Sequence, residues 1–194
     1  ARRAALLDVA GDEPVLLGHT RDDQAEQVLL SLARGSGATS LAGIRPRSGQ
    51  FWHPLLEVRR AQTVQACREW EVEPWQDPHN GDPRFLRSRV RTELMPVMEE
   101  VLGPEVAASL ARSATLLAGE DEVVARVARM WADKHGVSTN ELPGLRGVEV
   151  GLARRVVKEW LPQARMVHVD AVLGLLDGPG GAGVDVPGGR VEMR

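Results

Sequence analysis

Residues 14–35 read PVLLGHTRDDQAEQVLLSLARG, and this stretch decides the fold of the first half of the chain. A short apolar run at residues 15–17 is bounded by proline and glycine, as in a buried strand of a parallel sheet. Apolar residues then follow at helical spacing before a stop signal at Gly35; they are Ala25, Val28, Leu29 and Leu32. The stretch predicts a parallel strand followed directly by a helix.

The turn between this strand and this helix carries the first candidate site. It holds His19, Asp22 and Asp23, with Glu26 one turn later. In an open α/β sheet such a turn lies at the carboxyl edge, where ligands bind. Asp23 and Glu26 share a helix face, so they could bind Mg²⁺ against nucleotide phosphates or accept a proton from an attacking amine. Thr20 and Asp23 also match a helix capping box, and the residues alone favour that structural alternative.

The second candidate site is the sequence DPHNGDPRFLRSRVR at residues 77–91. It packs four arginines into eight positions, and on a helix Arg84, Arg87 and Arg91 fall within about 60° of one another. Three guanidinium groups on one stripe suit a phosphate backbone or an ATP tail. The alternative is a solvated face, paired with Asp77, Asp82 and Glu93. Helix signals run from about residue 84 to 95, where Pro96 is expected to end or kink the helix.

The rest of the chain suggests a change of architecture along its length. Residues 35–48 are typical of a loop, residues 51–56 of a second strand, and residues 59–70 of a helix. Later segments are mainly helical, at about 104–134, 148–161 and 167–176, and a small hairpin is expected at 184–191. The pattern predicts an α/β domain over residues 1–97, followed by a smaller, mainly helical domain with a C-terminal hairpin over residues 98–194.

Composition limits the classes of protein. The 24 Lys and Arg residues against 27 Asp and Glu residues give a net charge of −3, so contact with nucleic acid must come from a local patch. The single cysteine excludes an intrachain disulfide and a cysteine-rich zinc site, and it fits a reducing cytoplasm. No apolar run approaches the roughly 20 residues of a membrane span, so no membrane partner is expected.

Together the two motifs resemble one family, the tRNA(Ile)-lysidine synthetases of the PP-loop ATP pyrophosphatases. That family shows G-H-x-x-D-D-Q-A-E-T-x-L-L-x-L-x-R-G-x-G, which residues 18–37 match, and D-P-x-N-x-D-x-x-F-x-R-N-R-I-R, which residues 77–91 match. His53-Pro54-Leu55-Leu56 followed by Arg59 resembles its R-P-L-L-x-x-x-R. Gln27 and Ser88 are mild departures from the usual Thr and Asn.

The resemblance implies an enzyme that joins L-lysine to cytidine 34 of a tRNA(Ile) with a CAU anticodon, through an adenylated cytidine, releasing AMP and pyrophosphate. It implies ATP and Mg²⁺ as cofactors, tRNA(Ile) and L-lysine as partners, and a homodimer as the assembly to consider. The first 97 residues would be the C-terminal part of the parallel-sheet PP-loop domain. The remainder would be a tRNA-binding domain with its connecting helix.

Site residues carry over by motif position. The implied catalytic residues are His19, Asp23, Glu26, Asn80 and Arg91, with Asp23 and Glu26 as the metal ligands. The implied tRNA-binding residues are Arg84, Arg87 and Arg89. Asp22 is expected to cap its own helix.

The family's phosphate loop, S-G-G-x-D-S, occurs nowhere in the 194 residues. In the family order it precedes residue 1, so the chain is expected to be N-terminally truncated, and the 194 residues alone are expected to be inactive because ATP lacks its phosphate cradle. Two alternatives remain open. One is a tRNA-thiolating PP-loop enzyme, for which the lone Cys67 is a poor candidate, and the other is a non-catalytic tRNA-binding module.

Overall fold

The structure is a computed structural model that describes residues 2–75, 77–137, 142–178 and 180–192. The chain divides into two compact units, Ala1–Ala118 and Gly119–Arg194. Helix α7 (Val106–His135) begins in the first unit and continues into the second. No helix in the described part of the chain is both long enough and apolar enough to cross a membrane.

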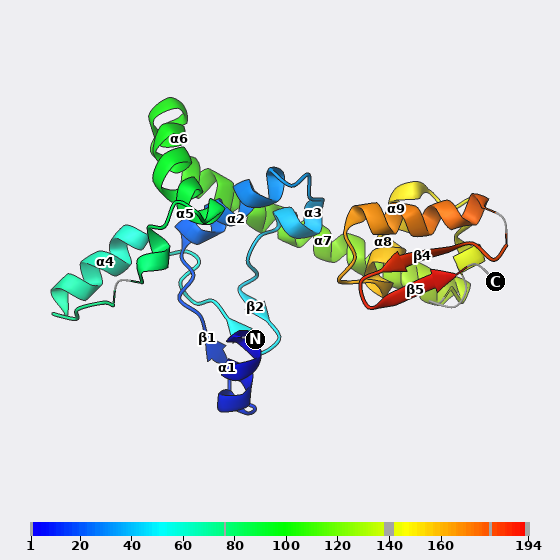
Figure 1. Cartoon of the computed structure of the whole chain (residues 1–194), viewed down its shortest axis with the longest axis horizontal. Coiled ribbons are helices and arrows are strands. Elements are labelled where there is room, and N and C mark those ends of the chain that lie inside the picture. The colour runs from blue at the N-terminus through cyan, green and yellow to red at the C-terminus, as the bar shows by residue number, and fades with distance from the viewer. Residues whose placement is uncertain (1, 76, 138–141, 179, 193–194) are drawn as a thin grey trace. The chain divides into compact units, whose positions relative to one another are not determined.

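A small mixed sheet lies in the first unit (Figure 1). Strand β1 (Val15–Leu16) pairs in parallel with β3 (Phe51–Trp52), with Val15 opposite Phe51. Strand β2 (Arg47–Ser48) pairs with β3 in the antiparallel direction. The expectation of a loop throughout residues 35–48 was therefore wrong at two places: Ala38–Leu41 form helix α3, and the end of the segment forms β2, after which Gly49, with φ 59°, reverses the chain. The sheet is parallel only between β1 and β3.

Two helices of the first unit, at residues 60 and 86, begin within two residues of the expected positions. Helices make up most of this unit. They are α1 (Arg2–Ala10), α2 (Arg21–Leu32), α3 (Ala38–Leu41), α4 (Arg60–Glu69), α5 (Leu86–Arg89) and α6 (Met95–Leu102). Two short turns lie among them, the 3₁₀ turn η1 (Pro78–Asn80) and the π turn η2 (Val90–Leu94).

Helix α2 begins as its sequence predicts. Thr20 is the N-cap: its side chain accepts from the backbone N–H of Asp23, while its own N–H donates to Asp23 Oδ2 at 2.8 Å. This reciprocal capping box satisfies two donors that the first turn would otherwise leave free. Ala25 and Val28 are buried as expected, but Leu32, at the end of the helix, is exposed.

A buried glutamine joins α2 to the loop that follows it. The Gln24 amide accepts from Ile44 N–H at 2.6 Å and donates to Ile44 O at 3.2 Å. Gly43 lies against this amide with φ +65°, and a Cβ there would come within 2.5 Å of Gln24 Oε1. A side chain at residue 43 would therefore clash as well as strain the backbone, so the loop approaches α2 through a glycine.

Pro96 was expected to end or kink the helix, and the helical stretch does not end there. Helices α5 and α6 are joined by the π turn η2, in which Met95 N–H donates to Val90 O, five residues back. Proline lacks an N–H and its ring crowds the carbonyl four residues earlier. The wider π turn just before Pro96 relieves that conflict, so the helical path continues to Leu102.

The second unit packs a helical core against a hairpin. It contains the end of α7, α8 (Val150–Trp160), α9 (Met166–Gly174), the 3₁₀ turns η3 (Leu142–Leu145) and η4 (Leu175–Asp177), and the strands β4 (Gly183–Val186) and β5 (Gly189–Glu192). The antiparallel β4–β5 hairpin is confirmed, and it lies beside α9 (Figure 1). Residues 138–141, between the expected helices at 104–134 and 148–161, lie outside the described residues.

Leu145→Ala is expected to destabilise the second unit by about 3 kcal/mol, because it removes a fully buried side chain and leaves a cavity. Leu145 is 1% exposed and packs in the core with Val156, Val157 and Val169. Urea unfolding followed by tryptophan fluorescence would measure the change, since Trp131 and Trp160 pack against this core. The exposed Leu116→Ala is the matched control; equal losses for the two variants would contradict the packing.

Candidate active site

Two carboxylates from the first turns of α2 form the centre of the site. Asp23 has a side chain that is 13% exposed, and the Glu26 side chain is 1% exposed. One oxygen of Asp23, Oδ2, is used by the capping box with Thr20. Its other oxygen, Oδ1, and both oxygens of Glu26 face three arginines. The capping and functional interpretations of Asp23 therefore apply to different oxygens of one side chain.

Two of these arginines come from the second motif. Arg87 donates from Nε to Glu26 Oε2 at 2.9 Å and from Nη2 to Asp23 Oδ1 at 3.2 Å. Arg91 donates from Nε and Nη2 to Glu26 at 2.8 and 3.0 Å, which is a two-point fork on one carboxylate, and also reaches Asp23 Oδ1 at 3.2 Å. Side chains that are separated by 61 to 68 positions in the chain thus meet in one cluster.

The third arginine, Arg60, was not among the expected site residues. Its Nη2 donates to Asp23 Oδ1 and to Glu26 Oε1, both at 3.0 Å. Arg59, which we matched to the last arginine of R-P-L-L-x-x-x-R, instead pairs with Glu105 at 2.6 Å. That match was wrong by one residue: three positions separate Leu56 from Arg60, so a correct count along the motif would have found it.

Asp22 also differs from its expected role. Its Oδ2 accepts from the backbone N–H of Arg60 at 2.8 Å. Asp22 therefore caps the first turn of α4, whereas Thr20 and Asp23 cap α2. A first-turn carboxylate normally stabilises its own helix, and only the approach of α4 to α2 redirects this one.

The charges of the cluster explain how two buried carboxylates coexist. Burial raises the pKa of both Asp23 and Glu26, and it is the largest single influence on each. Hydrogen bonds from Thr20 to Asp23, and from Arg91 and Arg87 to Glu26, outweigh burial and hold both pKa values below their ordinary range. The hydrogen bond to Glu26 also raises the pKa of Arg91. With two anions and three cations, the cluster carries one net positive charge.

A histidine pair borders the cluster. The His19 and His53 rings lie 5.0 Å apart between centroids, and His53 Nδ1 is 2.8 Å from Arg45 O. A carbonyl only accepts, so His53 Nδ1 carries the proton of this hydrogen bond. His19 Nδ1 and His53 Nε2 are buried nitrogens with no hydrogen-bond partner among the described residues. Burial lowers the pKa of His19, against the opposing charge of Asp23, so His19 is neutral near pH 7.

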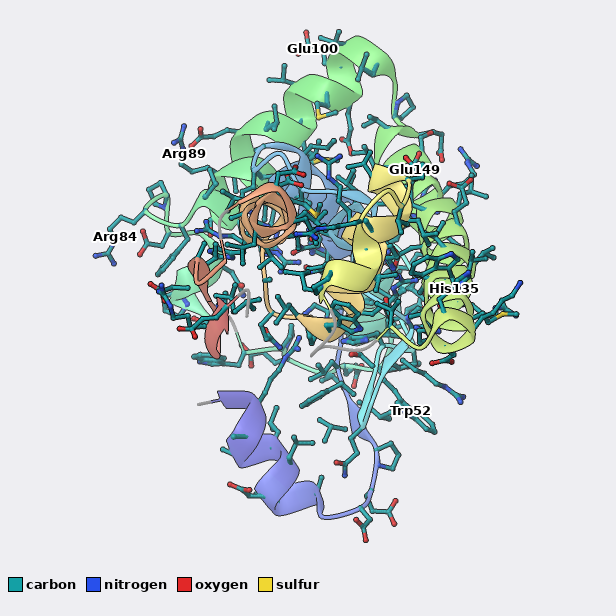
Figure 2. All side chains as sticks on the ribbon, turned by 90° about the vertical axis from the view of Figure 1, so that its right-hand side faces the viewer. Trp52, Arg84, Arg89, Glu100, His135 and Glu149 are labelled. Carbon is teal, nitrogen blue, oxygen red and sulfur yellow. The ribbon has the colours of Figure 1, made fainter. Side chains whose placement is uncertain are left out.

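The remaining residues of the arginine motif lie apart from the cluster. Helix α5 begins only at Leu86, so Arg84 precedes it and the expected stripe of three is wrong at that residue. Arg84 pairs with Asp82 at 2.6 Å and Arg89 with Glu93 at 3.1 Å, and both side chains project outward in Figure 2. Each alternative we considered therefore applies to part of the motif: two arginines enter the cluster, and two are paired on a solvated face.

Asn80 lies on the exposed 3₁₀ turn η1, where its backbone N–H donates to Asp77 O at 3.0 Å. Among the described residues, no hydrogen bond joins the Asn80 side chain to the carboxylates. The structure therefore brings together His19, Asp23, Glu26, Arg87 and Arg91, and it leaves Asn80, Arg84 and Arg89 outside the cluster.

The carboxylate pair does not suit Mg²⁺ in this arrangement. The three oxygens that could face a metal ion accept hydrogen bonds from guanidinium groups, and a divalent cation would meet three positive charges at close range. No group of three or more metal-ligating side chains occurs in the described residues. The expected ligation of Mg²⁺ by Asp23 and Glu26 therefore does not fit this arrangement of charges.

Comparison with known proteins agrees with the two motifs. A family model described as a PP-loop domain matches residues 3–98. The chain is 98% identical, over all 194 residues, to a tRNA(Ile)-lysidine synthase of Cutibacterium acnes, of which it covers 62%. It is 48% identical over 165 residues (83% of the chain) to the same-named protein of Mycolicibacterium paratuberculosis, covering 51% of it, and 42% identical over its whole length to that of Thermobifida fusca, covering 64%.

The chain thus spans between about half and two thirds of the length of these relatives. The matches include both segments that meet in the cluster, since the PP-loop match extends across residues 18–37 and 77–91. The chain therefore belongs to the PP-loop family and is similar over its whole length to tRNA(Ile)-lysidine synthases.

Proposed function

We propose that the protein of which this chain forms part modifies tRNA: with ATP, it ligates L-lysine to cytidine 34 of a tRNA(Ile) with a CAU anticodon. The observation that carries the proposal is the convergence of both family motifs on one buried cluster of two carboxylates and three arginines. The names of the relatives support the same reaction. We also propose that this work is done in the cytoplasm, where tRNA is used.

The reaction has two steps. The C2 oxygen of cytidine first attacks the α-phosphate of ATP, and pyrophosphate leaves. The lysine amine then attacks C2, AMP leaves with the oxygen, and the amine loses a proton. Negative charge grows on both leaving groups, and a cluster with one net positive charge is suited to stabilise it. Mg²⁺ would bind the ATP phosphates and would not be coordinated by Asp23 and Glu26.

Residue roles follow from the environments of the side chains. Arg87 and Arg91, anchored on Glu26, would offer guanidinium donors to the phosphate groups. Asp23 and Glu26 are weak bases because their pKa values are lowered. His19 is the better proton acceptor: it is neutral, and its Nδ1 has no partner among the described residues. The carboxylates would then serve to hold the arginines in place.

The proposed tRNA contacts are more peripheral. Arg84 and Arg89 are exposed and can exchange an acidic neighbour for an RNA phosphate at little cost, because ion pairs of exposed side chains contribute little to stability. We assign Asn80 to the target nucleotide by its motif position, and residues 98–194 to tRNA binding away from the anticodon. A homodimer remains part of the proposal.

The test is lysine-dependent AMP release by a protein of the relatives' full length that carries this chain. We expect labelled lysine to enter a tRNA(Ile) transcript with a CAU anticodon and not one in which cytidine 34 is replaced by uridine. RNA binding without AMP release would favour a binding module instead. Since S-G-G-x-D-S is absent from the 194 residues, we infer that these residues alone release no pyrophosphate.

A further inference from the structure

Arg60 differs from the other two arginines of the cluster in where it comes from. Arg87 and Arg91 lie one turn apart on the helical stretch of α5 and η2, whereas Arg60 is the first residue of α4. A single atom, Arg60 Nη2, donates to both Asp23 and Glu26 at 3.0 Å. Arg60 therefore links the two carboxylates from a separate helix.

The backbone around Arg60 is tied to the start of α2. Arg60 N–H donates to Asp22 Oδ2 at 2.8 Å, and Arg21 N–H donates to Val58 O at 2.9 Å. These two bonds hold the beginning of α4 against the residues that precede the carboxylates. The guanidinium group of Arg60 is thus placed by its own backbone, and not by its side-chain contacts alone.

We propose that Arg60 is a positioning residue, which holds the Asp23 and Glu26 carboxylates in one fixed arrangement and is itself held by Asp22. The inference rests on the proposed function, because that function gives the carboxylates their role. When Arg87 and Arg91 bind phosphate groups, their contacts with the carboxylates weaken. Arg60 then supplies the remaining positive charge that keeps two neighbouring buried carboxylates ionised and in place.

If Arg60 contributed to stability alone, its removal would leave kcat of the folded protein unchanged, whereas removal of a positioning residue lowers kcat and alters its pH dependence. The charged or titratable groups that face the carboxylates are Arg60 of α4, Arg87 of α5, Arg91 of η2, and His19 of the turn before α2. Removing Arg60 takes away one of three cations, so the pKa values of Asp23 and Glu26 should rise. If activity needs both carboxylates ionised, then on lowering the pH it should be lost at a higher pH in the variant without Arg60 than in the wild type.

The experiment compares Arg60→Ala, Arg60→Lys and Arg59→Ala in a protein of the relatives' full length. Arg59 is the matched control, because it is the adjacent arginine and pairs with Glu105 on the surface. For Arg60→Ala we expect kcat for lysidine formation to fall by roughly tenfold to a hundredfold, with the acidic limb of its pH profile moved upward. Arg60→Lys should recover part of the lost kcat and return the acidic limb most of the way to its wild-type position. A single nitrogen of Arg60 contacts both carboxylates, and one ammonium group can replace it.

Three results would overturn the proposal. One is an acidic limb of Arg60→Ala that coincides with that of the wild type. Another is a kcat for Arg60→Lys that is no higher than that of Arg60→Ala. The third is a loss of kcat in Arg59→Ala as large as the loss in Arg60→Ala. Asp22→Asn keeps an oxygen that can accept from the Arg60 N–H, so it should retain more activity than Asp22→Ala. The reverse order would also contradict the positioning role of Arg60.

A measurement without catalysis separates this proposal from the proposed function. Carbon-13 NMR of the Asp23 and Glu26 side-chain carboxyl groups reports their titration directly, and both should titrate at higher pH in Arg60→Ala. If these titrations shift while the wild type forms no lysidine, the proposed function fails and the positioning role stands. If lysidine forms but neither titration moves, the positioning role fails alone.

Discussion

Arg91→Ala is expected to reduce lysidine formation by roughly a hundredfold to a thousandfold, the loss usually seen when one donor to a developing negative charge is removed. Arg91 forks onto Glu26 and also reaches Asp23, so its guanidinium group is placed before substrate binds. Steady-state kinetics with labelled lysine would measure the change, and the loss should appear in kcat rather than in the KM for tRNA.

Asp23→Asn should cause a comparable loss by a different route. The amide keeps an oxygen that can serve the capping box with Thr20, but it removes the negative charge that faces three arginines. Arg68→Ala is the control for both variants, because Arg68 is an exposed arginine in the last turn of α4, outside the cluster and outside the residues assigned to tRNA binding. Near wild-type turnover in Arg91→Ala or in Asp23→Asn would sink the assignment of this cluster as the active site.

Glu26→Gln is expected to lower the free energy of unfolding by about 3 kcal/mol or more, because removing one charge from a buried ionic cluster leaves its partners uncompensated. Glu26 is almost completely buried and accepts hydrogen bonds from Arg60, Arg87 and Arg91. Urea denaturation would measure the loss. Glu93→Gln is the matched control, since Glu93 is exposed and pairs only with Arg89 among the described contacts; its loss should be about 0.5 kcal/mol.

The same glutamate should make stability depend on pH in a defined direction. Its pKa in the folded protein is lowered, so it contributes stability that is fully present above its ordinary pKa of about 4. That contribution is lost as the pH falls through the lower pKa of the folded state. The wild type should therefore lose stability below about pH 4 more steeply than Glu26→Gln, and parallel curves would contradict the ionised state of Glu26.

Local features of the fold could be predicted because they depend on neighbouring residues. The capping box of Thr20 and Asp23, the helix that follows, and the C-terminal hairpin all rest on contacts within a few positions. The errors fell where packing overrides local preference. Leu32 is exposed although it belongs to the periodic pattern, and Ala38–Leu41 form a helix beside α2 within the segment expected to be a loop.

Two ordered motifs indicate, without any coordinates, which residue types are available for the site and which family the chain resembles. How those residues are used depends on the folded chain, which brings distant segments together. Asp22 caps the neighbouring helix, and Arg84 pairs with Asp82 instead of joining Arg87 and Arg91. The physical reason is that a buried charge must be compensated by whichever partner the packing of distant segments brings within hydrogen-bond distance, and that distance is not encoded in local spacing.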